Sequence, residues 1–514
     1  MRTKYSLRNA FVGASTQVLS MLLAFVCRYI FTHILSAEYL GVEGLFSNIL
    51  TLLSLSELGV GSAITFFMYK PIAENDTHKL RQLLQMYRSI YNVIGVATTV
   101  VGLGLTPFIG FFIKSPPQSV EHLSLIYVMY VLNLSLSYFF TYNASIIEAN
   151  QKNYISTLIR FFFQCLQVAA QITLLLLTHN FILYLLVQVV TTLIINIVTT
   201  LVARRMYPYI CQERVEPLDK EERHYIFKNV RAMFMHNIGN AVVNGTDNIL
   251  ISKFVGLVET GIYSNYAMIV RALTSLLSTA FAAVTASVGN LGTENNPEKT
   301  HRIFERLNFL DFWVFSFSTI SFFVLSEPFL KILYGPQYVF PTYISLAIAL
   351  NFYLSGMRQV VLRFRNAMGL FYRDRYKPVF ESIINLVVSI LLVQRFGIVG
   401  VFWGTSVSTL TTAFWIEPLI LFKYGFHMPQ GRYYLKYGVY ALLTAAVGVA
   451  TYFVAGLIPF GGIGGLLCRA LVCLAIPNGL YYLIFRRTDD FQYFQQLFCE
   501  KAKAMRGKKD KTEP

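Results

Sequence analysis

The sequence predicts an all-α polytopic membrane protein with fourteen transmembrane helices. The chain has 514 residues, of which 55% are hydrophobic and 14% are charged, whereas soluble domains carry roughly a quarter charged residues. The apolar residues fall in blocks of about twenty, the length that crosses a bilayer core as a helix. Helices are required because lipid offers no partners to unpaired backbone groups, and the sequence lacks the period-2 alternation of a membrane barrel.

Fourteen apolar blocks are long enough to be spans. The first follows a basic N-terminus, as a secretory signal would, but it runs on without an A-x-A cleavage pattern and carries Arg28. It is therefore expected to stay in the protein as the first span. The eleventh is short and bears Glu381 and Asn385, which makes it the weakest of the set. The expected spans are 11–35, 42–68, 90–112, 123–147, 154–177, 181–202, 230–255, 260–288, 307–333, 342–362, 378–396, 399–421, 437–457 and 466–485.

The distribution of positive charge tests this count. With the N-terminus inside, almost every Lys and Arg outside the spans falls in a cytoplasmic segment, and the outer loops hold only Lys114, Lys253, Lys331 and Arg395. A miscounted span would move every later loop to the opposite side of the membrane and destroy this asymmetry. The positive-inside rule therefore supports the topology with both termini cytoplasmic. The same asymmetry accounts for the net charge of +16 without a nucleic-acid partner. It favours a multi-pass membrane protein.

An internal repeat predicts the domain organisation. The motif G-L-F-S-N at 44–48 recurs as G-I-Y-S-N at 261–265, and each copy stands at the start of a span. A duplication would map spans 1 and 2 onto spans 7 and 8 and give two six-helix lobes related by a pseudo-two-fold axis. The expected order is an N-terminal lobe (1–203), a cytoplasmic linker (204–229), a C-terminal lobe (230–423), helices 13 and 14 (424–486) and a basic cytoplasmic tail (487–514). The end of this tail, RGKKDKTEP, is expected to be disordered.

Three segments carry a resemblance to a known family. They are RYIFTHILSAEYLGVEGLFSNILTLLSLSELGVGSAITFFMYKPIAEND (28–76), TDNILISKFVGLVETGIYSNYAMIV (246–270) and, more weakly, SVGNL (287–291). The first closely resembles the N-terminal signature of bacterial polysaccharide-repeat flippases of the multidrug/oligosaccharidyl-lipid/polysaccharide (MOP) exporter superfamily. The resemblance implies two six-helix lobes around a central cavity, as in the multidrug exporters of that superfamily, with two extra C-terminal helices. It also implies alternating access and undecaprenyl-pyrophosphate-linked glycans as substrates.

Several charged side chains fall inside the expected spans. A charge at mid-span costs about 2.5–3.5 kcal/mol on insertion scales, so it should have a partner or a function. Each of these side chains lies on a polar stripe at helical spacing, which should face other helices or water rather than lipid. The clearest cases, which lie in the four helices that line the cavity in the family the chain resembles, are Arg28, Glu57, Asp247 and Arg271. Asn244 shares the stripe of Asp247, and Arg358 lies near the cytoplasmic end of the tenth span.

Two interpretations of these residues stay open. In the functional one, Arg28, Arg271 and Arg358 bind a pyrophosphate with the help of Asn244, because a guanidinium stays ionised and donates two hydrogen bonds to a phosphate. Asp247 or Glu57 would then couple transport to H+ or Na+. In the structural one, Arg28 pairs with Glu57 or Asp247 and locks helices together. Charges near span ends are expected to extend toward the headgroups: Arg363, Arg365, Glu381, Glu417 and Arg469.

The function predicted from these features is transport, not catalysis. The protein is expected to be a monomeric flippase without a bound cofactor or metal, acting on lipid-linked oligosaccharides for capsule or exopolysaccharide assembly. It would contact membrane lipids and work beside a polysaccharide polymerase and glycosyltransferases. A peptidoglycan-precursor flippase and a multidrug exporter are the alternatives within the superfamily, although three intramembrane arginines favour an anionic lipid head. A membrane glycosyltransferase or polymerase is the rival from another class, but the outer loops are short and almost free of His, Asp and Glu.

Overall fold

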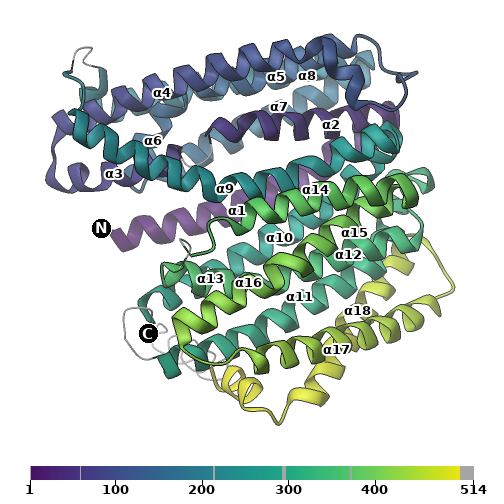
Figure 1. Cartoon of the computed structure of the whole chain (residues 1–514). Coiled ribbons are helices and arrows are strands. Elements are labelled where there is room, and N and C mark those ends of the chain that lie inside the picture. Colours follow the sequence, from purple (N-terminus) through teal and green to yellow (C-terminus); the bar gives the residue numbers. More distant parts are fainter. Residues whose placement is uncertain (1, 58–59, 212–214, 292–296, 371–372, 498–514) are drawn as a thin grey trace, which may run out of the picture. The chain divides into compact units, whose positions relative to one another are not determined.

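The computed structural model describes residues 2–57, 60–211, 215–291, 297–370 and 373–497, which form helices joined by short turns, without a strand among them (Figure 1). Within these ranges, side chains are described except at 2–7, 55–56, 62–63, 229, 231–244, 280 and 282–291. The all-α fold class is confirmed for the described residues. The helices group into two compact units, residues 1–272 with 375–408 and residues 273–374 with 409–514. The expected lobes were defined by the sequence repeat, whereas these units are defined by the packing of the helices. The boundaries of the lobes therefore stay a prediction.

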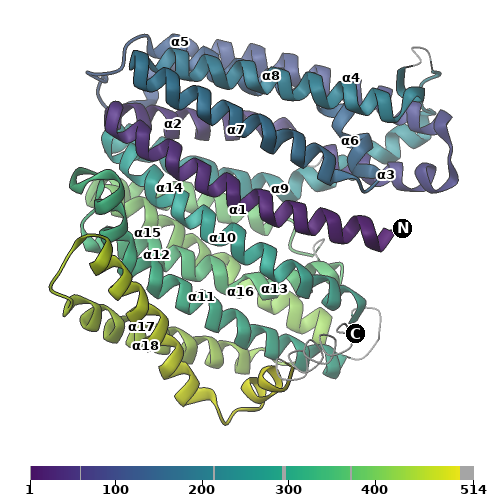
Figure 2. The same cartoon turned by 180° about the vertical axis from the view of Figure 1, so that it is seen from behind.

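The first unit combines the helices of the N-terminal half with three later ones. Its helix α1 lies along α7, α7 along α8, and α2 against α9 (Figures 1 and 2). A core of buried apolar and aromatic side chains, among them Met68, Tyr87 and Tyr91, joins its helices at one end. Its elements are α1 (Arg2–Ile34), α2 (Ala37–Leu53), η1 (Ser54–Glu57), α3 (Val60–Glu74), α4 (Thr77–Gly104), η2 (Thr106–Phe112), α5 (Leu123–Tyr138), α6 (Thr141–Ala149), α7 (Asn153–Thr178), α8 (Phe181–Met206), η3 (Pro208–Cys211), α9 (Lys220–Phe254), the start of α10 (Leu257–Leu291), α14 (Lys377–Phe396) and α15 (Ile398–Ser408).

The second unit is built around α11, which packs against α12, α17 and α18. Aromatic rings fill this packing: Phe312 of α11 stacks on Tyr440 with 4.0 Å between ring centroids and lies 5.2 Å from the ring of Tyr481. Its elements are the end of α10, α11 (Pro297–Tyr334), η4 (Pro336–Tyr338), α12 (Thr342–Met357), α13 (Gln359–Ala367), a π-helical turn (Thr409–Ala413), α16 (Phe414–Ile420), a second π-helical turn (Leu421–Phe426), α17 (Gly431–Gly456) and α18 (Gly462–Phe485).

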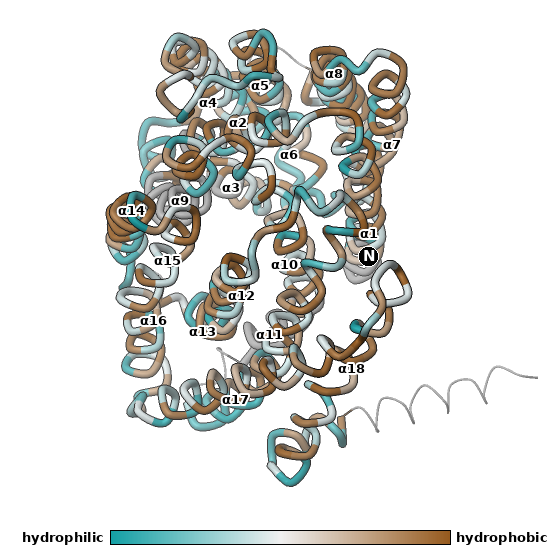
Figure 3. Tube along the Cα trace, turned by 90° about the vertical axis from the view of Figure 1, so that its right-hand side faces the viewer, coloured by the Kyte–Doolittle hydropathy of each residue, from teal (hydrophilic) through white to brown (hydrophobic). Residues whose placement is uncertain are grey.

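The exposed surfaces of the helices are those of a membrane protein. Nine helices among the described residues are long and apolar enough to cross a bilayer, and two bent pairs raise this to eleven if each pair is one span. Large apolar side chains such as Leu442, Leu457 and Leu467 are exposed, and Figure 3 shows apolar residues predominating along α14 and α18. Such surfaces need lipid to cover them. A polytopic membrane protein is therefore confirmed, whereas the count of fourteen stays a prediction.

The three expected spans outside these eleven are 42–68, 230–255 and 260–288. The first of them is broken, because α2 ends at Leu53, a 3-10 turn follows to Glu57, and α3 begins at Val60. Ser54 in this turn competes for the helix hydrogen bonds by donating to the carbonyl of Thr51 at 2.8 Å. The second expected span therefore stays a prediction. The other two expected spans lie within α9 and α10, which carry the polar stripes.

The ends of the expected linker and tail are more helical than their charge suggested. Helix α9 begins at Lys220, inside the expected linker, and two acidic residues in its first turn, Glu221 and Glu222, suit the positive end of the helix dipole. Residues 489–497 of the tail are also helical, and Phe491 stacks on Trp313 of α11 with 5.8 Å between ring centroids. Its aromatic side chains find a place on the unit's core. The disorder expected for residues 506–514 stays a prediction. Residues 498–514 lie outside the described part.

The two copies of the repeated motif lie against each other. A Cβ atom on Gly41 of α2 would stand 1.9 Å from the carbonyl oxygen of Leu257, and one on Gly44 would stand 2.5 Å from Oγ of Ser264. Conversely, a Cβ on Gly261 of α10 would stand 2.4 Å from the carbonyl oxygen of Ala37. Small residues thus allow the backbones of α2 and α10 to cross in close contact. This crossing fixes the helices that carry the charged residues of the first unit.

Candidate functional site

An ion pair joins the first two helices of the first unit. Arg28 of α1 donates from Nη1 to Oε2 of Glu43 at 3.0 Å and from Nη2 to Oε1 at 3.4 Å, so both prongs of the guanidinium face the carboxylate of α2. The two side chains are 12% and 28% exposed. A partly exposed pair of this geometry holds the arginine in place and leaves it reachable by an anion. The predicted residue Arg28 is thus paired, but with Glu43, which the sequence analysis had not considered.

Arg271 of α10 lies near this pair. It is near enough to Arg28 and Glu43 for their charges to act on it, and its own side chain is exposed. Within the described part of the chain it makes no hydrogen bond or ion pair with a carboxylate. Two guanidinium groups and one carboxylate, from α1, α2 and α10, therefore lie within electrostatic reach of one another in the first unit. We call Arg28, Glu43 and Arg271 the charge cluster.

Asp247 and Tyr263 adjoin the charge cluster. The hydroxyl of Tyr263 on α10 donates to Oδ2 of Asp247 on α9 at 3.4 Å, and the Tyr263 ring lies 4.9 Å from that of Phe402. The charge of Arg271 also acts on Tyr263. The other carboxylate oxygen of Asp247 is buried without a hydrogen-bond partner among the described atoms. The structure thus brings three of the predicted site residues, Arg28, Asp247 and Arg271, into one region of the first unit.

Two further predicted residues are not placed in this region. Glu57 lies in the 3-10 turn after α2, where its Oε1 accepts a hydrogen bond from the hydroxyl of Tyr91 at 3.1 Å. It lies fourteen residues beyond Glu43 along the chain, about 20 Å if the stretch were fully helical. The side chain of Asn244 lies outside the described residues, although its backbone belongs to α9.

Arg358 belongs to the second unit and is held by a carboxylate there. It stands at the break between α12 and α13, where its Nε donates to Oε2 of Glu417 at 3.1 Å and its Nη2 to Oε1 at 2.7 Å. The Glu417 side chain is fully buried, with 0% exposure, and lies on α16 between two π-helical turns. π-Helical turns are frequent at functional sites. This bidentate pair matches the helix-locking interpretation.

The structure also corrects the expectation for several charges near span ends. Arg365 forms a buried ion pair with Asp374, and Lys377 donates to Oε2 of Glu381 at 2.9 Å. Arg365, Glu381 and Glu417 are thus buried inside the protein rather than extended toward the headgroups. The physical reason is that each of these side chains has an oppositely charged partner within reach. Forming that ion pair costs less free energy than extending the side chain through apolar packing to reach water. Arg469 lies two turns into α18 and donates to the backbone carbonyls of Ala455 and Ile458.

We expect a double-mutant cycle of Arg358→Ala and Glu417→Ala to give a coupling energy of about 1–3 kcal/mol. Glu417→Ala alone should lower the stability more than the double substitution does, because it leaves a partly buried guanidinium without its carboxylate. Thermal unfolding of the purified protein in detergent measures all three variants. Additive effects would show that the pair does not lock α12 and α13 to α16.

A family comparison adds to this geometry. A model of the family described as "Polysaccharide biosynthesis protein" matches residues 6–286, more than half of the chain. The chain belongs to this family. The match covers all helices that contribute to the charge cluster, from α1 to most of α10. Sequence comparison with curated proteins found no match.

Solved structures of MOP-superfamily proteins share the fold of this member of the family. It is similar to the lipid II flippase MurJ in an inward closed conformation, with a TM-score of 0.64 and 15% identity over 92% of this chain and 98% of that one. It is also similar to an inward-facing multidrug resistance MATE family transporter, with a TM-score of 0.64 and 15% identity over 79% of this chain and 96% of that one. At such identity the likeness concerns the fold. The predicted resemblance to MOP-superfamily exporters is confirmed at that level.

Proposed function

We propose that the protein is a flippase that moves undecaprenyl-pyrophosphate-linked oligosaccharide repeat units from the inner to the outer leaflet of a bacterial cytoplasmic membrane. Capsule or exopolysaccharide assembly would use the product. The observation that carries this proposal is the charge cluster. A glycan alone or a purely apolar chain would not need cations in its binding site. A diphosphate does bind two guanidinium groups well, which offsets the cost of placing these groups in membrane helices. Membership of the polysaccharide biosynthesis family supports the glycan part of the proposal.

The cluster suggests how the diphosphate is held. Arg271 is exposed and has no carboxylate partner in the described part of the chain, so it offers the first contact to an anion. Arg28 is bound to Glu43 in this structure, and a phosphate can take the place of that carboxylate because both accept two parallel hydrogen bonds from a guanidinium. Release of Glu43 from Arg28 would then accompany binding. Glu43 joins Asp247 as a candidate for coupling to H+ or Na+, and Glu57 is a weaker one because it lies apart from the cluster.

Arg358 has a different role in this proposal. A phosphate would have to displace Glu417, whose side chain is fully buried, and the displaced carboxylate would have no water to receive it. We therefore assign Arg358 to the packing of the second unit. The flippase would act by alternating access as a monomer, without a cofactor, beside the glycosyltransferases and polymerase of one assembly pathway.

Deletion of the gene tests the proposed function. The lipid-linked repeat unit should accumulate in the inner leaflet, because its synthesis continues while its transfer stops. The measurement is the accessibility of the glycan to an impermeant glycosidase or lectin in right-side-out and inverted membrane vesicles. Disappearance of the lipid-linked glycan would indicate a synthetic enzyme instead. Build-up of the peptidoglycan precursor would indicate a lipid II flippase, and an unchanged glycan with higher drug sensitivity would indicate a multidrug exporter.

A further inference from the structure

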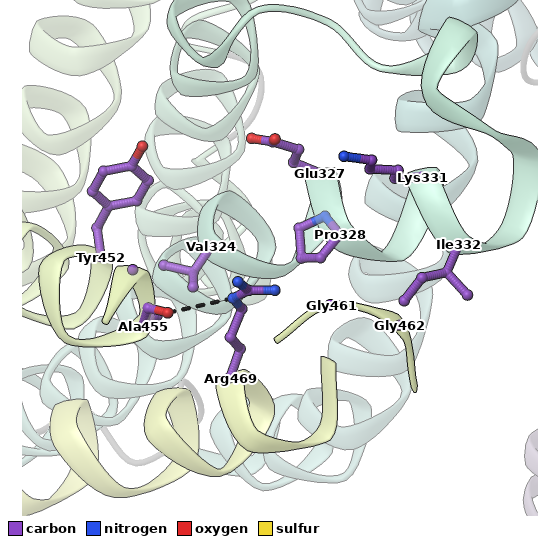
Figure 4. A pocket seen from close by; sticks show the side chains of 11 residues that line it. Val324, Glu327, Pro328, Lys331, Ile332, Tyr452, Ala455, Gly461, Gly462 and Arg469 are labelled. Atoms are coloured by element: carbon purple, nitrogen blue, oxygen red, sulfur yellow. Dashed lines mark hydrogen bonds between the residues drawn. The ribbon is translucent and has the colours of Figure 1, made fainter. Parts of the chain in front are cut away.

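A cavity lies in the second unit, where α11 and α17 end and α18 begins. Its volume is about 360 Å³, in the range of small ligand sites. Figure 4 shows the side chains around it: Arg469 of α18 rises from below, and Glu327 and Lys331 of α11 stand on the opposite rim. No residue of the charge cluster or of the Arg358–Glu417 pair lines this cavity. It is therefore a site separate from the one proposed for the transported diphosphate.

Arg469 is held at the cavity by backbone atoms. Its Nε donates to the carbonyl oxygen of Ala455 at 3.3 Å and its Nη2 to that of Ile458 at 3.2 Å. Ala455 lies in the last turn of α17 and Ile458 just after it, so these bonds fix the guanidinium against the C-terminal end of that helix. Among the described residues, Arg469 has no ion pair with a carboxylate. A fixed cation with donors left over is available to an anion.

The opposite rim supplies one charge of each sign. Glu327 and Lys331 are one helical turn apart on α11, and both side chains are exposed. The described residues include no ion pair of either side chain with another residue. With Arg469, the cavity thus has two cations and one carboxylate, and its formal net charge is +1 when all three are ionised. One negative charge on a ligand would neutralise it.

The start of α18 adds backbone donors. Gly461 is the N-cap of this 24-residue helix and provides no side-chain cap, so the N–H groups of the first turn lack side-chain partners from it. Gly461 and Gly462 line the cavity, and a Cβ built on either would meet no atom within 4 Å. Glycines leave room for a phosphate to approach the positive end of a helix closely. Arg469 and the helix start therefore favour the same kind of ligand.

Apolar side chains surround the entrance to this end of the unit. Leu457, Phe460 and Ile463, in the loop and at the start of α18, are 79%, 51% and 68% exposed. The topology predicted from loop charges puts these residues, with Lys331, at the outer face of the membrane. A basic cavity next to exposed apolar residues at a span end is suited to a lipid, with the headgroup inside and the acyl chains alongside.

We propose that this cavity binds the phosphodiester headgroup of a membrane phospholipid in the outer leaflet. The phosphodiester carries one negative charge, which matches the cavity, and its oxygens accept from Arg469, from Lys331 and from the N-terminal turn of α18. Inorganic phosphate has the same acceptor oxygens, but it has no acyl chain to contact Leu457, Phe460 or Ile463. The lipid would hold α17 and α18 against α11 and would not itself be transported.

Binding of phosphatidylglycerol to the full-length protein tests the proposal. Native mass spectrometry of delipidated protein in detergent should show one tightly bound phosphatidylglycerol. Arg469→Gln should weaken this binding about tenfold or more, because a hydrogen bond to a charged group is lost. Since Arg469 also supports α17, Gly461→Val provides a second variant: its extended backbone accepts valine, and the new side chain fills the cavity without meeting another atom within 4 Å of its Cβ. It should also weaken binding at least about tenfold while the thermal midpoint is kept.

Arg395→Gln is the matched control. Arg395 is an exposed basic residue at the end of α14, on the membrane face predicted for the cavity, and its loss should leave phosphatidylglycerol binding unchanged. Millimolar inorganic phosphate should not displace the lipid. Equal lipid binding by wild type, Arg469→Gln and Gly461→Val would overturn the proposal. Displacement by inorganic phosphate would also overturn it in favour of a free-anion site, and displacement by farnesyl diphosphate but not by added phospholipid would assign the cavity to the transported lipid.

Discussion

Gly41→Val should prevent the first unit from folding into its observed structure. A Cβ at this position would stand 1.9 Å from the carbonyl oxygen of Leu257, a backbone atom that cannot rotate away as a side chain can. The helices α2 and α10 would have to separate, and overpacking of this kind costs about 1–3 kcal/mol or more even where side chains can adjust. We expect the variant to be recovered poorly from membranes and to aggregate in size-exclusion chromatography after mild heating.

The reciprocal substitution should behave in the same way. Gly261→Val places its Cβ 2.4 Å from the carbonyl oxygen of Ala37 on the other side of the same crossing. Gly13→Val is the matched control, because Gly13 also lies in a helix of the first unit and a Cβ there would meet nothing within 4 Å. If all three variants unfolded at the same temperature, the crossing of α2 and α10 would not be the contact that the fold depends on.

These two glycines show which part of the fold the sequence could predict. The repeat of 44–48 at 261–265 was visible, and it correctly drew attention to the starts of two helices. That the two copies touch each other could not be derived, because a repeat states that two segments are alike and not that they are neighbours. The 3-10 turn after Leu53 was missed for a local reason: hydropathy averages over a window and passes over Ser54, whose hydroxyl competes for the helix hydrogen bonds.

The carboxylate partners of the arginines were missed for a different reason. Glu43 stands one residue inside the expected start of its span, where a charge is ordinarily interfacial, but α2 begins at Ala37 and carries Glu43 two turns into the helix. Glu417 stood near the expected end of its span, whereas the helical stretch continues through a π-helical turn to Phe426. Helices extend beyond their apolar blocks when polar residues on one face find partners inside the protein. A test for basic residues within reach of such span-end acids could have found both.

The cost of placing a charge in a membrane singled out Arg28 and Arg271 in the sequence. That argument identifies residues that need a partner or a function, and it cannot say which. The structure divides them: Arg28 and Arg358 have carboxylate partners, and Arg271 makes no such pair among the described residues. Whether Arg271 contacts the substrate therefore decides between binding and packing.

Arg271→Ala should reduce export of the lipid-linked glycan about ten- to a hundredfold, the effect of losing hydrogen bonds between a guanidinium and a phosphate. It should leave the thermal midpoint almost unchanged, since the side chain is exposed and no carboxylate in the described part of the chain loses its partner. The measurement is the glycan exposed on the outer leaflet of cells in which the variant replaces the wild-type protein, together with thermal unfolding of the purified variant.

Comparison with Arg28 makes this test specific. Arg28→Ala should lower both export and stability, because it leaves Glu43 without its partner, and Glu43→Ala added to it should recover stability but not export. Arg271→Lys should recover part of the export, because a lysine keeps the charge but cannot donate the two parallel hydrogen bonds of a guanidinium. A purely structural cluster would give the opposite pattern, with export following stability through the whole series. Normal export by Arg271→Ala would remove the cation on which the proposed diphosphate site depends.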